Sequence, residues 1–252
     1  MSETKGRRIV IGDVHGHYDA LMRLIEAIAP GEGDRLYFLG DLIDRGPQSA
    51  RVVKFVRESS YQCLLGNHEH LLLDVCRNGK INPGAMQGWR YSGGQSTLAS
   101  YPPLHSNPTQ ALLNDVEWMR TLPLYLDLGD AWLVHAGVHP QLPLEEQGAE
   151  DFCWIREPFH SISQPYFPNK LIIVGHTITF TFQGVKPGQL AKGCGWLGID
   201  TGAYHSLSGW LTGLDITHQQ VYQVHVSKHS LRTMRLQDAV ATIKPPRRVA
   251  RR

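Results

Sequence analysis

The chain has 252 residues, of which 42% are hydrophobic and 19% are charged, a composition that supports a buried core and excludes a disordered chain. Its formal net charge of +2 is too balanced to indicate a nucleic-acid or anionic-membrane partner. The basic first residues lack the apolar stretch of a secretory signal, and no segment reaches the roughly 18 apolar residues that span a bilayer. Four scattered cysteines without a CxxC pair are typical of free thiols in a reducing compartment. We therefore expect a cytoplasmic globular protein.

The first third of the chain alternates between predicted strands and helices. Short apolar runs at residues 8–11, 36–39 and 62–65 predict strands. Leu21, Leu24 and Ile28 recur at helical spacing after the first run, and valines at helical spacing follow the second. This βαβαβ order predicts a largely parallel sheet flanked by helices.

The remainder predicts an insertion and then more strands. Residues 80–120 contain paired glycines, paired prolines and a helix at 110–120, so we interpret them as an inserted cap or loop region. Further strands are expected at 132–134, 171–174, 196–199, 210–214 and 221–224. Short turns without helices separate the later strands, which favours an antiparallel second sheet. We predict one α/β domain over residues 1–252, with two packed sheets, outer helices and a basic tail from about residue 243.

Five of the turns after predicted strands carry side chains that bind metals. They are GDVHG at 12–16, GDLIDRG at 40–46, GNHE at 66–69, HAG at 135–137 and GHT at 175–177. Ligand sites in α/β sheets form outside the carboxyl ends of the strands, so these turns could converge. Each motif alone is more often structural: Asp13 could cap a helix, and Asn67 could belong to a turn. Five together have no shared structural reason and indicate one site.

The residue types in these turns point to a particular chemistry. Carboxylate and amide oxygens combined with imidazole nitrogens suit manganese, iron or zinc better than magnesium or calcium. A carboxylate can bridge two such ions about 3.5–4 Å apart, which activate water and neutralise phosphoryl charge. Arg45 lies in the second turn and could hold phosphoryl oxygens in a bidentate contact. The sequence therefore predicts a two-metal phosphoesterase that hydrolyses phosphate monoesters.

Other residues of the same types have simpler interpretations. We expect the histidines beside the motifs to be supporting or surface residues: His17, His70 and His139. Histidines outside any motif are expected at the surface: His105, His160, His218, His225 and His229. Cys63, Cys76 and the tryptophans are expected in the core. Gly93-Gly94 favours a tight turn, with a loop that shapes substrate entry as the alternative.

In this order the motifs resemble the signature of the phosphoprotein phosphatase family of calcineurin-like metallophosphoesterases. WIRE at 154–157 and IDTGA at 199–203 extend the similarity toward the bacterial and bacteriophage lambda type of serine/threonine phosphatase, over about residues 8–216. The resemblance implies the calcineurin-like metallophosphoesterase fold, with two packed mixed sheets flanked by helices. It also implies two divalent metal ions, with Mn²⁺ as the usual ion and iron or zinc as alternatives.

The resemblance further implies a role for each motif residue. Asp13 and His15 would bind the first metal ion, and Asp41 would bridge both ions. The implied ligands of the second ion are Asn67, His135 and His176. His68 resembles the general acid that protonates the leaving group, with Asp44 orienting it. The implied phosphate-binding residues are Arg45 and Arg156.

Three functions remain open at this point. The resemblance implies a protein or peptide substrate carrying phosphoserine or phosphothreonine, with phosphotyrosine and small phosphoesters also open, and no nucleic-acid or membrane partner. The alternative is a symmetrical diadenosine tetraphosphatase, a family that usually departs from DRG and has GNHD in place of GNHE. The DRG at 44–46 and Glu69 therefore favour the phosphatase. A non-catalytic scaffold is the third hypothesis, but such proteins lose metal ligands, and this sequence keeps all of the expected ones.

Overall fold

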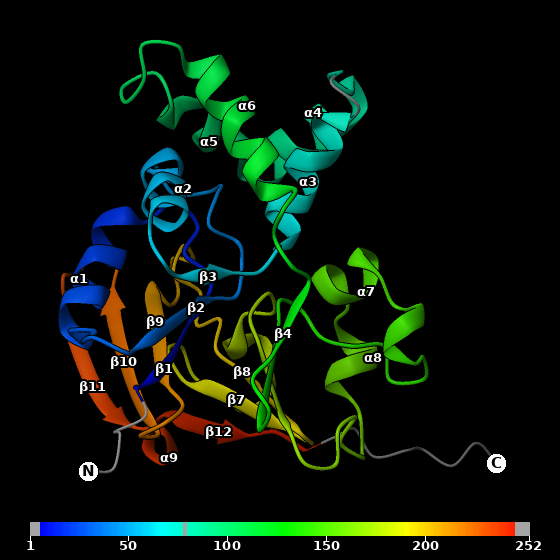
Figure 1. Ribbon diagram of the computed structural model, residues 1–252. Helices are drawn as coiled ribbons and strands as arrows, with labels where there is room; N and C mark the ends of the chain where they lie inside the picture. The colour runs from blue at the N-terminus through cyan, green and yellow to red at the C-terminus, as the bar shows by residue number, and fades with distance from the viewer. Residues whose placement is uncertain (1–5, 78–79, 245–252) are drawn as a thin grey trace.

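Two six-stranded β-sheets pack face to face in the computed structural model, which describes residues 6–77 and 80–244 (Figure 1). The first sheet has the strand order β11-β10-β9-β1-β2-β3. Its strands are β1 (Arg8–Ile11), β2 (Arg35–Phe38), β3 (Gln62–Cys63), β9 (Trp210–Asp215), β10 (Gln220–His225) and β11 (Leu231–Arg235). β1, β2 and β3 are parallel, as the βαβαβ pattern predicts, whereas β9 to β11 are added antiparallel beyond β1.

The second sheet has the order β12-β7-β8-β6-β5-β4. Its strands are β4 (Tyr125–Asp127), β5 (Ala131–Val134), β6 (Leu171–Val174), β7 (Leu190–Gly193), β8 (Trp196–Gly198) and β12 (Val240–Thr242). The central strands β5, β6 and β8 are parallel to one another, while β4 and β7 pair with them in the antiparallel direction. Both sheets are therefore mixed, which confirms the predicted fold class.

The prediction of an antiparallel second sheet from the later strands is wrong. β9 and β10 do follow each other through a tight turn, but β9 pairs with β1 and so completes the first sheet. β5, β6 and β8 lie in parallel because residues 135–170 and 175–195 cross over between them. The sequence did not predict β4, β7, β11 and β12, since each is only three to five residues long and all except β7 are edge strands.

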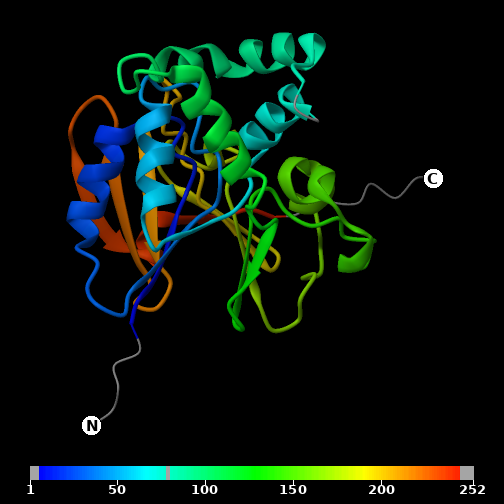
Figure 2. The ribbon, with the colours of Figure 1, turned by 45° about the horizontal axis from the view of Figure 1, so that its top comes forward.

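Helices cover the outer face of each sheet (Figures 1 and 2). α1 (Tyr18–Ile28) and α2 (Ser49–Glu58) pack on the first sheet, and α7 (Ala149–Trp154) and α8 (Glu157–His160) pack on the second. The remaining short helices are η3 (Leu144–Glu146), η4 (Thr179–Thr181) and α9 (Leu236–Ala239).

The region expected to be an inserted cap is a helical layer above α2 (Figure 1). It follows α3 (Asn67–Val75) and comprises α4 (Pro83–Trp89), η2 (Arg90–Gly94), α5 (Gln95–Ser100) and α6 (Pro108–Met119). The predicted helix at 110–120 is confirmed as α6, which begins after the capping residue Asn107. α5 and α6 contact α2, so this layer is anchored to the first sheet through that helix.

The core follows the two-residue period of the strands. In β1, Ile9 and Ile11 pack against the helices of the first sheet, while Val10 points between the two sheets. All three side chains are fully buried, and each contributes about 1.5–3 kcal/mol relative to an exposed position. Val10 meets residues of the second sheet such as Leu133 and Ile173 in one cluster. This cluster fixes the two sheets against each other and therefore sets the distance between their strand ends.

Two of the predictions about single histidines are wrong. His160 and His225, expected at the surface, are 8% and 6% exposed. His160 is enclosed by the aromatic rings of Phe182 and Trp196, and His225 packs edge-on against Trp210. His218 and His229 are exposed as expected.

Other predictions concern the cysteines, the tryptophans and the termini. Cys63 and Cys76 are buried, and all four thiols are free. The prediction that the tryptophans are in the core is confirmed for Trp89, Trp132 and Trp196 and is wrong for the other three, which are half-buried: Trp118, Trp154 and Trp210. Within residues 6–77 and 80–244, no helix is long and apolar enough to cross a lipid bilayer. Most of the predicted basic tail lies outside the described residues.

Candidate metal centre

Two groups of potential ligand atoms meet where the predicted motifs converge. His15, Asp41 and His68 offer atoms that all lie within 4.8 Å of one another, and so do Asp41, His135 and His176. All five side chains are buried. Asp41 belongs to both groups, which is the arrangement that a carboxylate shared by two cations requires.

The parallel strands of both sheets position these side chains. His15 follows β1, Asp41 follows β2, and His68 stands in the first turn of α3, just after β3. His135 and His176 follow β5 and β6 of the second sheet. One group therefore comes from the first sheet alone, whereas the other forms only because the two sheets pack together.

The turns that carry these residues have unusual backbone conformations. Positive φ angles occur at five non-glycine site residues: His15 (46°), Asp41 (49°), Asp44 (72°), Arg45 (71°) and His176 (62°). Such angles are uncommon for residues with a Cβ atom and concentrate at functional sites. A Cβ atom at Gly175 would overlap the Asp13 carboxylate, so this glycine allows the β6 turn to approach the β1 turn.

The hydrogen bonds of two imidazoles fix where their lone pairs point. His15 Nδ1 lies 2.9 Å from the Ile43 carbonyl oxygen, and His135 Nδ1 lies 2.8 Å from that of Leu39. A carbonyl oxygen only accepts, so each Nδ1 carries the proton, and in the neutral ring Nε2 carries the lone pair. Burial lowers the pKa of both histidines, which favours the neutral rings.

These lone pairs face a carboxylate. Nε2 of His15 lies 3.5 Å from one oxygen of Asp41, and Nε2 of His135 lies 3.4 Å from the other. Two acceptors that face each other repel unless a cation lies between them. The fixed tautomers, each held by a backbone carbonyl, are those found in histidines that bind metal through Nε2. The residues present therefore fit divalent cations on both sides of Asp41.

Buried carboxylates provide a second argument for cations. Burial, together with the charges of Asp200 and Asp41, raises the pKa of Asp13 well above its usual range. Burial also raises the pKa of Asp200 to about 6. Asp13 accepts the backbone N–H of His176 at 3.0 Å, and Asp200 accepts that of Gly202 at 2.9 Å, but no Lys or Arg pairs with either acid within the described residues. Divalent cations would compensate this negative charge.

Asn67 connects the two sheets at the same point. Its side-chain oxygen lies 2.9 Å from His135 Nε2 and 2.6 Å from His176 Nδ1. Asp41 accepts the backbone N–H of His68, the next residue along α3. All six predicted metal ligands therefore lie together, although Asp13 and Asn67 are not members of the two groups defined by the 4.8 Å spacing.

His68 and Asp44 form a buried pair beside the Asp41 carboxylate. His68 Nδ1 lies 2.6 Å from Asp44 Oδ2, and its Nε2 lies 4.0 Å from Asp41 Oδ2. Burial opposes protonation of His68, but the two carboxylates outweigh it and raise the pKa of the ring. The pair thus holds a proton on an imidazole that faces the candidate metal centre.

The inserted helical layer holds the Asp44 carboxylate in place. The indole N–H of Trp89 donates to Asp44 at 2.9 Å, and the Thr97 hydroxyl donates at 2.6 Å. The Asp44 backbone N–H also donates to Thr97 and Ser49. Neither Trp89 nor Thr97 was identified from the sequence, because each lies far along the chain from the motif it supports.

Arg45 lies at the edge of the centre under an aromatic ring. One guanidinium nitrogen is 3.1 Å from His68 Nε2, and the guanidinium carbon is 3.9 Å from the centre of the Tyr204 ring. The Arg45 backbone N–H donates to Gly93, where a Cβ atom would press against the Arg45 side chain. Gly93-Gly94 therefore lies beside the site within a kinked helix, so the predicted tight turn is wrong, and a role of this pair in substrate entry stays a prediction.

Arg156 approaches from the second sheet. Its guanidinium donates to the Thr177 hydroxyl at 3.0 Å, and Thr177 directly follows His176. All ten predicted site residues thus lie in one region, with Arg45 and Arg156 contributed by different sheets.

Sequence reasoning missed several buried polar residues in this region. Glu69 accepts the backbone N–H groups of Gly66, Asp41 and Leu42, so it ties the second and third turns together. Asp200 and Tyr204 follow β8. Glu69 and Asp200 lie within motifs that the sequence analysis recognised, and their acidic side chains were the signal that could have identified them as site residues. Nothing in the local sequence indicated Tyr204.

Mixed sheets with histidine and aspartate side chains at their strand ends are the architecture of a metal-dependent phosphoesterase. The calcineurin-like phosphoesterase family matches residues 6–203, so the chain belongs to this family. It is 36% identical over 134 residues to the symmetrical bis(5'-nucleosyl)-tetraphosphatase of Dechloromonas aromatica. The matched segment covers 52% of this chain and 44% of that protein. The chain thus spans less than half the length of the curated relatives it matches.

Solved structures share the fold over most of the chain. A protein proposed to be a diadenosine tetraphosphatase has a TM-score of 0.59 and 19% identity, covering 93% of this chain and 96% of its own. A serine/threonine phosphatase from Saccharomyces cerevisiae has a TM-score of 0.55 and 16% identity, covering 92% of this chain and 80% of its own. At these identities the likeness shows the fold alone.

Proposed function

We propose that the protein is a two-metal hydrolase whose substrates are dinucleoside tetraphosphates, cleaved symmetrically. The observation that carries the hydrolase is the Asp41 carboxylate, whose two oxygens face the Nε2 lone pairs of His15 and His135. The substrate class is supported by curated relatives that are symmetrical bis(5'-nucleosyl)-tetraphosphatases. In such a cleavage, water adds to one of the two central phosphorus atoms, and the bond from this atom to the oxygen that bridges the two central phosphorus atoms breaks. The products are two nucleoside diphosphates.

The metal ligands in this proposal are those implied by the sequence resemblance. They are Asp13, His15, Asp41, Asn67, His135 and His176. Divalent ions at such a pair of sites lower the pKa of water and neutralise charge on phosphoryl oxygens. Mixed oxygen and nitrogen ligands favour Mn²⁺, iron or zinc. His68 also lies near Asp41, but its Nδ1 contacts Asp44 and its Nε2 contacts Arg45. We therefore do not assign His68 as a metal ligand.

In that role His68 donates a proton to the leaving oxygen, and Asp44 orients the ring. The contact between Arg45 and Nε2 requires an accepting nitrogen, whereas the neighbouring carboxylates favour a protonated ring. A phosphoryl group bound between the two side chains would accept from both and remove this conflict. Arg45 and Arg156 would then hold the phosphates from opposite sheets.

A second candidate is a phosphatase acting on phosphoserine or phosphothreonine. The observation that favours it is the buried His68–Asp44 pair, because an alkoxide leaving group needs protonation far more than a nucleotide phosphate does. Glu69 also fits this candidate: its carboxylate reaches the backbone of both neighbouring turns, and the shorter aspartate of GNHD would have less reach. A lambda-type phosphatase, a single domain and a cytoplasmic location remain predictions.

The test begins with protein stripped of metal and then restored with Mn²⁺. We expect hydrolysis only after restoration, with kcat/KM for diadenosine tetraphosphate at least tenfold above that for a phosphoserine peptide, and ADP as the sole nucleotide product. The opposite preference would replace the first candidate with the second. Absence of hydrolysis on both substrates with metal bound would contradict both and favour the non-catalytic scaffold.

A further inference from the structure

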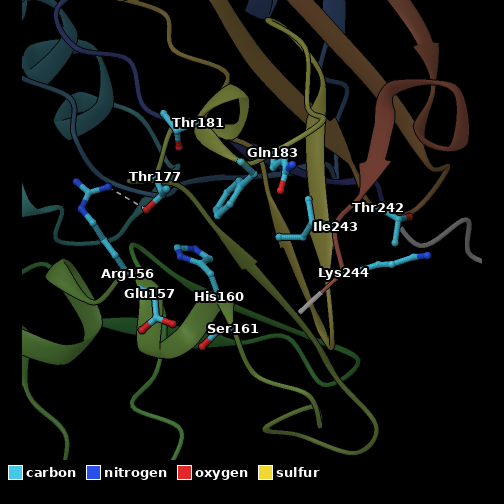
Figure 3. A pocket seen from close by; sticks show the side chains of 11 residues that line it. Arg156, Glu157, His160, Ser161, Thr177, Thr181, Gln183, Thr242, Ile243 and Lys244 are labelled. Carbon is cyan, nitrogen blue, oxygen red and sulfur yellow. Dashed lines mark hydrogen bonds between the residues drawn. The ribbon is translucent and has the colours of Figure 1, made fainter. Parts of the chain in front are cut away.

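A pocket of about 640 Å³ adjoins the candidate metal centre at Arg156 (Figure 3). We call it the α8 pocket, because α8 forms one wall. The chain after β6, around η4, forms a second wall, and the end of β12 forms a third. Pockets of about 300–1,000 Å³ are typical of small-molecule sites. Thr177, which lines this pocket, directly follows His176 of the centre.

Arg156 connects the pocket to the centre. Its guanidinium donates to Thr177, as Figure 3 shows, and both side chains line the pocket. Thr177 directly follows His176, so the guanidinium lies next to the turn that carries this residue of the centre. A phosphate chain held by Arg156 would place whatever it carries at the mouth of this pocket.

The walls of the pocket combine apolar faces, neutral polar groups and, besides Arg156, the charged side chains of Glu157 and Lys244. Phe182 and Ile243 supply the apolar faces. The Gln183 amide and the Ser161 hydroxyl also line the pocket, and neither side chain has a hydrogen-bond partner among the described residues. His160 is 92% buried, its Nε2 has no partner within the described part of the chain, and its ring projects from α8 toward this space (Figure 3).

We propose that the α8 pocket binds one nucleoside of the substrate, with its base against Phe182 and Ile243 and hydrogen-bonded to Gln183. This inference rests on the proposed dinucleoside tetraphosphate function. Aromatic faces and amide side chains are the groups that recognise a nucleobase, through stacking and through its hydrogen-bonding edge. The phosphates would extend past Arg156 into the centre, so a single chain of contacts joins the base to the reacting phosphorus.

The first experiment fills the pocket and measures binding. Ser161→Trp places an indole in the pocket, and Ser230→Trp makes the same change on an exposed turn before β11. Dissociation constants are measured calorimetrically for ADP and for methylenediphosphonate, which lacks the nucleoside, on Mn²⁺-restored protein. We expect Ser161→Trp to weaken ADP binding at least tenfold without changing methylenediphosphonate binding, and Ser230→Trp to change neither. Unchanged ADP binding, or equal loss for both ligands, would overturn the proposal.

Gln183→Ala provides a milder test should the larger side chain prevent folding. Gln183 is exposed and outside the packed core, so we expect a folded protein with threefold to tenfold weaker ADP binding and unchanged methylenediphosphonate binding. Equal ADP affinity in wild type and variant would overturn the assigned contact. These binding measurements test nucleoside binding in the α8 pocket independently of hydrolysis. If the wild-type protein does not hydrolyse diadenosine tetraphosphate, that result contradicts the proposed function but not the proposed binding site.

Discussion

The candidate metal centre and the α8 pocket lie on two sides of Arg156 and differ in how their polar groups are bonded. In the centre, most polar side chains have fixed partners: His15 and His135 meet backbone carbonyls, and Asp44 receives Trp89 and Thr97. In the pocket, Gln183 and His160 Nε2 lack partners within the described residues.

This difference in hydrogen bonding corresponds to two tasks, acting on the reacting atom and recognising the ligand. Groups that act on a reacting atom are most effective when they are held before the substrate arrives, because no reorganisation is then needed at the moment of reaction. Groups that recognise a ligand can remain unbonded until the ligand supplies the partner. Substitutions in the centre should therefore change the chemical step, whereas substitutions in the pocket wall should change binding or stability.

The largest effect is expected at Asp41, because both ligand groups use it. Asp41→Asn should reduce bound metal to at most one ion and lower kcat by more than about 10³-fold, since losing one fixed electrostatic group at a reaction centre already costs about 10²–10³-fold. Metal content by mass spectrometry and steady-state rates provide the measurement. Asp238→Asn, which changes an exposed carboxylate paired with Arg235, is the matched control. Two ions retained in Asp41→Asn would contradict a shared ligand.

His68→Asn should separate the two candidate substrates. Loss of the general acid should lower kcat by about 10²–10⁴-fold on an alkyl phosphomonoester such as a phosphoserine peptide. The effect on diadenosine tetraphosphate should be much smaller, because its leaving group needs little protonation. Both rates are measured on the same Mn²⁺-restored preparation. Equal losses on the two substrates would indicate that His68 binds metal or positions substrate instead.

His160 predicts a pH effect on stability that belongs to the pocket wall. Burial, helped by the charge of Arg156, lowers the pKa of His160 to about 4. The unfolded chain, with an ordinary histidine pKa of about 6.5, binds this proton more readily, so stability is full above pH 6.5 and falls as the pH drops toward 4. Between pH 7 and pH 5 this group alone should cost about 2 kcal/mol.

The measurement compares urea unfolding of wild type and His160→Phe at both pH values. The phenyl ring fits among Phe159, Phe182 and Trp196 and removes the titrating group. We expect the variant to lose about 2 kcal/mol less than wild type on acidification. Parallel losses in the two proteins would show that His160 does not titrate in this range.

The smallest effect is expected at Trp89, which acts through Asp44. Trp89→Phe removes one hydrogen bond to the carboxylate and should lower kcat on an alkyl phosphomonoester about tenfold, the equivalent of about 1.4 kcal/mol. Diadenosine tetraphosphate hydrolysis should change less, which a purely structural role would not produce. Trp196→Phe is the matched control, because its buried indole N–H has no partner among the described residues. For each variant, the rate on the alkyl phosphomonoester is divided by the rate on diadenosine tetraphosphate. If this ratio is the same in Trp89→Phe and Trp196→Phe, Trp89 does not position Asp44.

Much of the site could be predicted because its signals are local. A strand of apolar residues, a glycine turn and a metal-binding side chain lie within a few positions of each other, as in Ile11-Gly12-Asp13. The carboxyl ends of parallel strands share one edge of a sheet, so recognising the strands of the βαβαβ unit was enough to place Asp13, Asp41 and Asn67 near one another.

The supporting contacts could not be predicted in this way. Asp44 is held by Trp89 and Thr97, which lie 45 and 53 residues further along the chain. His160 has no motif and sits in a four-residue helix, so its burial depends on aromatic residues from other elements. Nothing in the local sequence records which distant side chain will fill a given space.

The sequence by itself determined the strands that carry the motifs, the residue types of the centre and the metallophosphoesterase family, because each follows from short-range pattern and chemistry. Only the tertiary structure decided that β9 pairs with β1, that Asn67 meets His135 across the two sheets, and that a pocket opens beyond Arg156. Hydrophobic periodicity shows which face of a strand is buried, but it does not show which edge finds which partner. Pairing and packing between distant segments depend on how the whole core fits together, and the α8 pocket is a product of that fit.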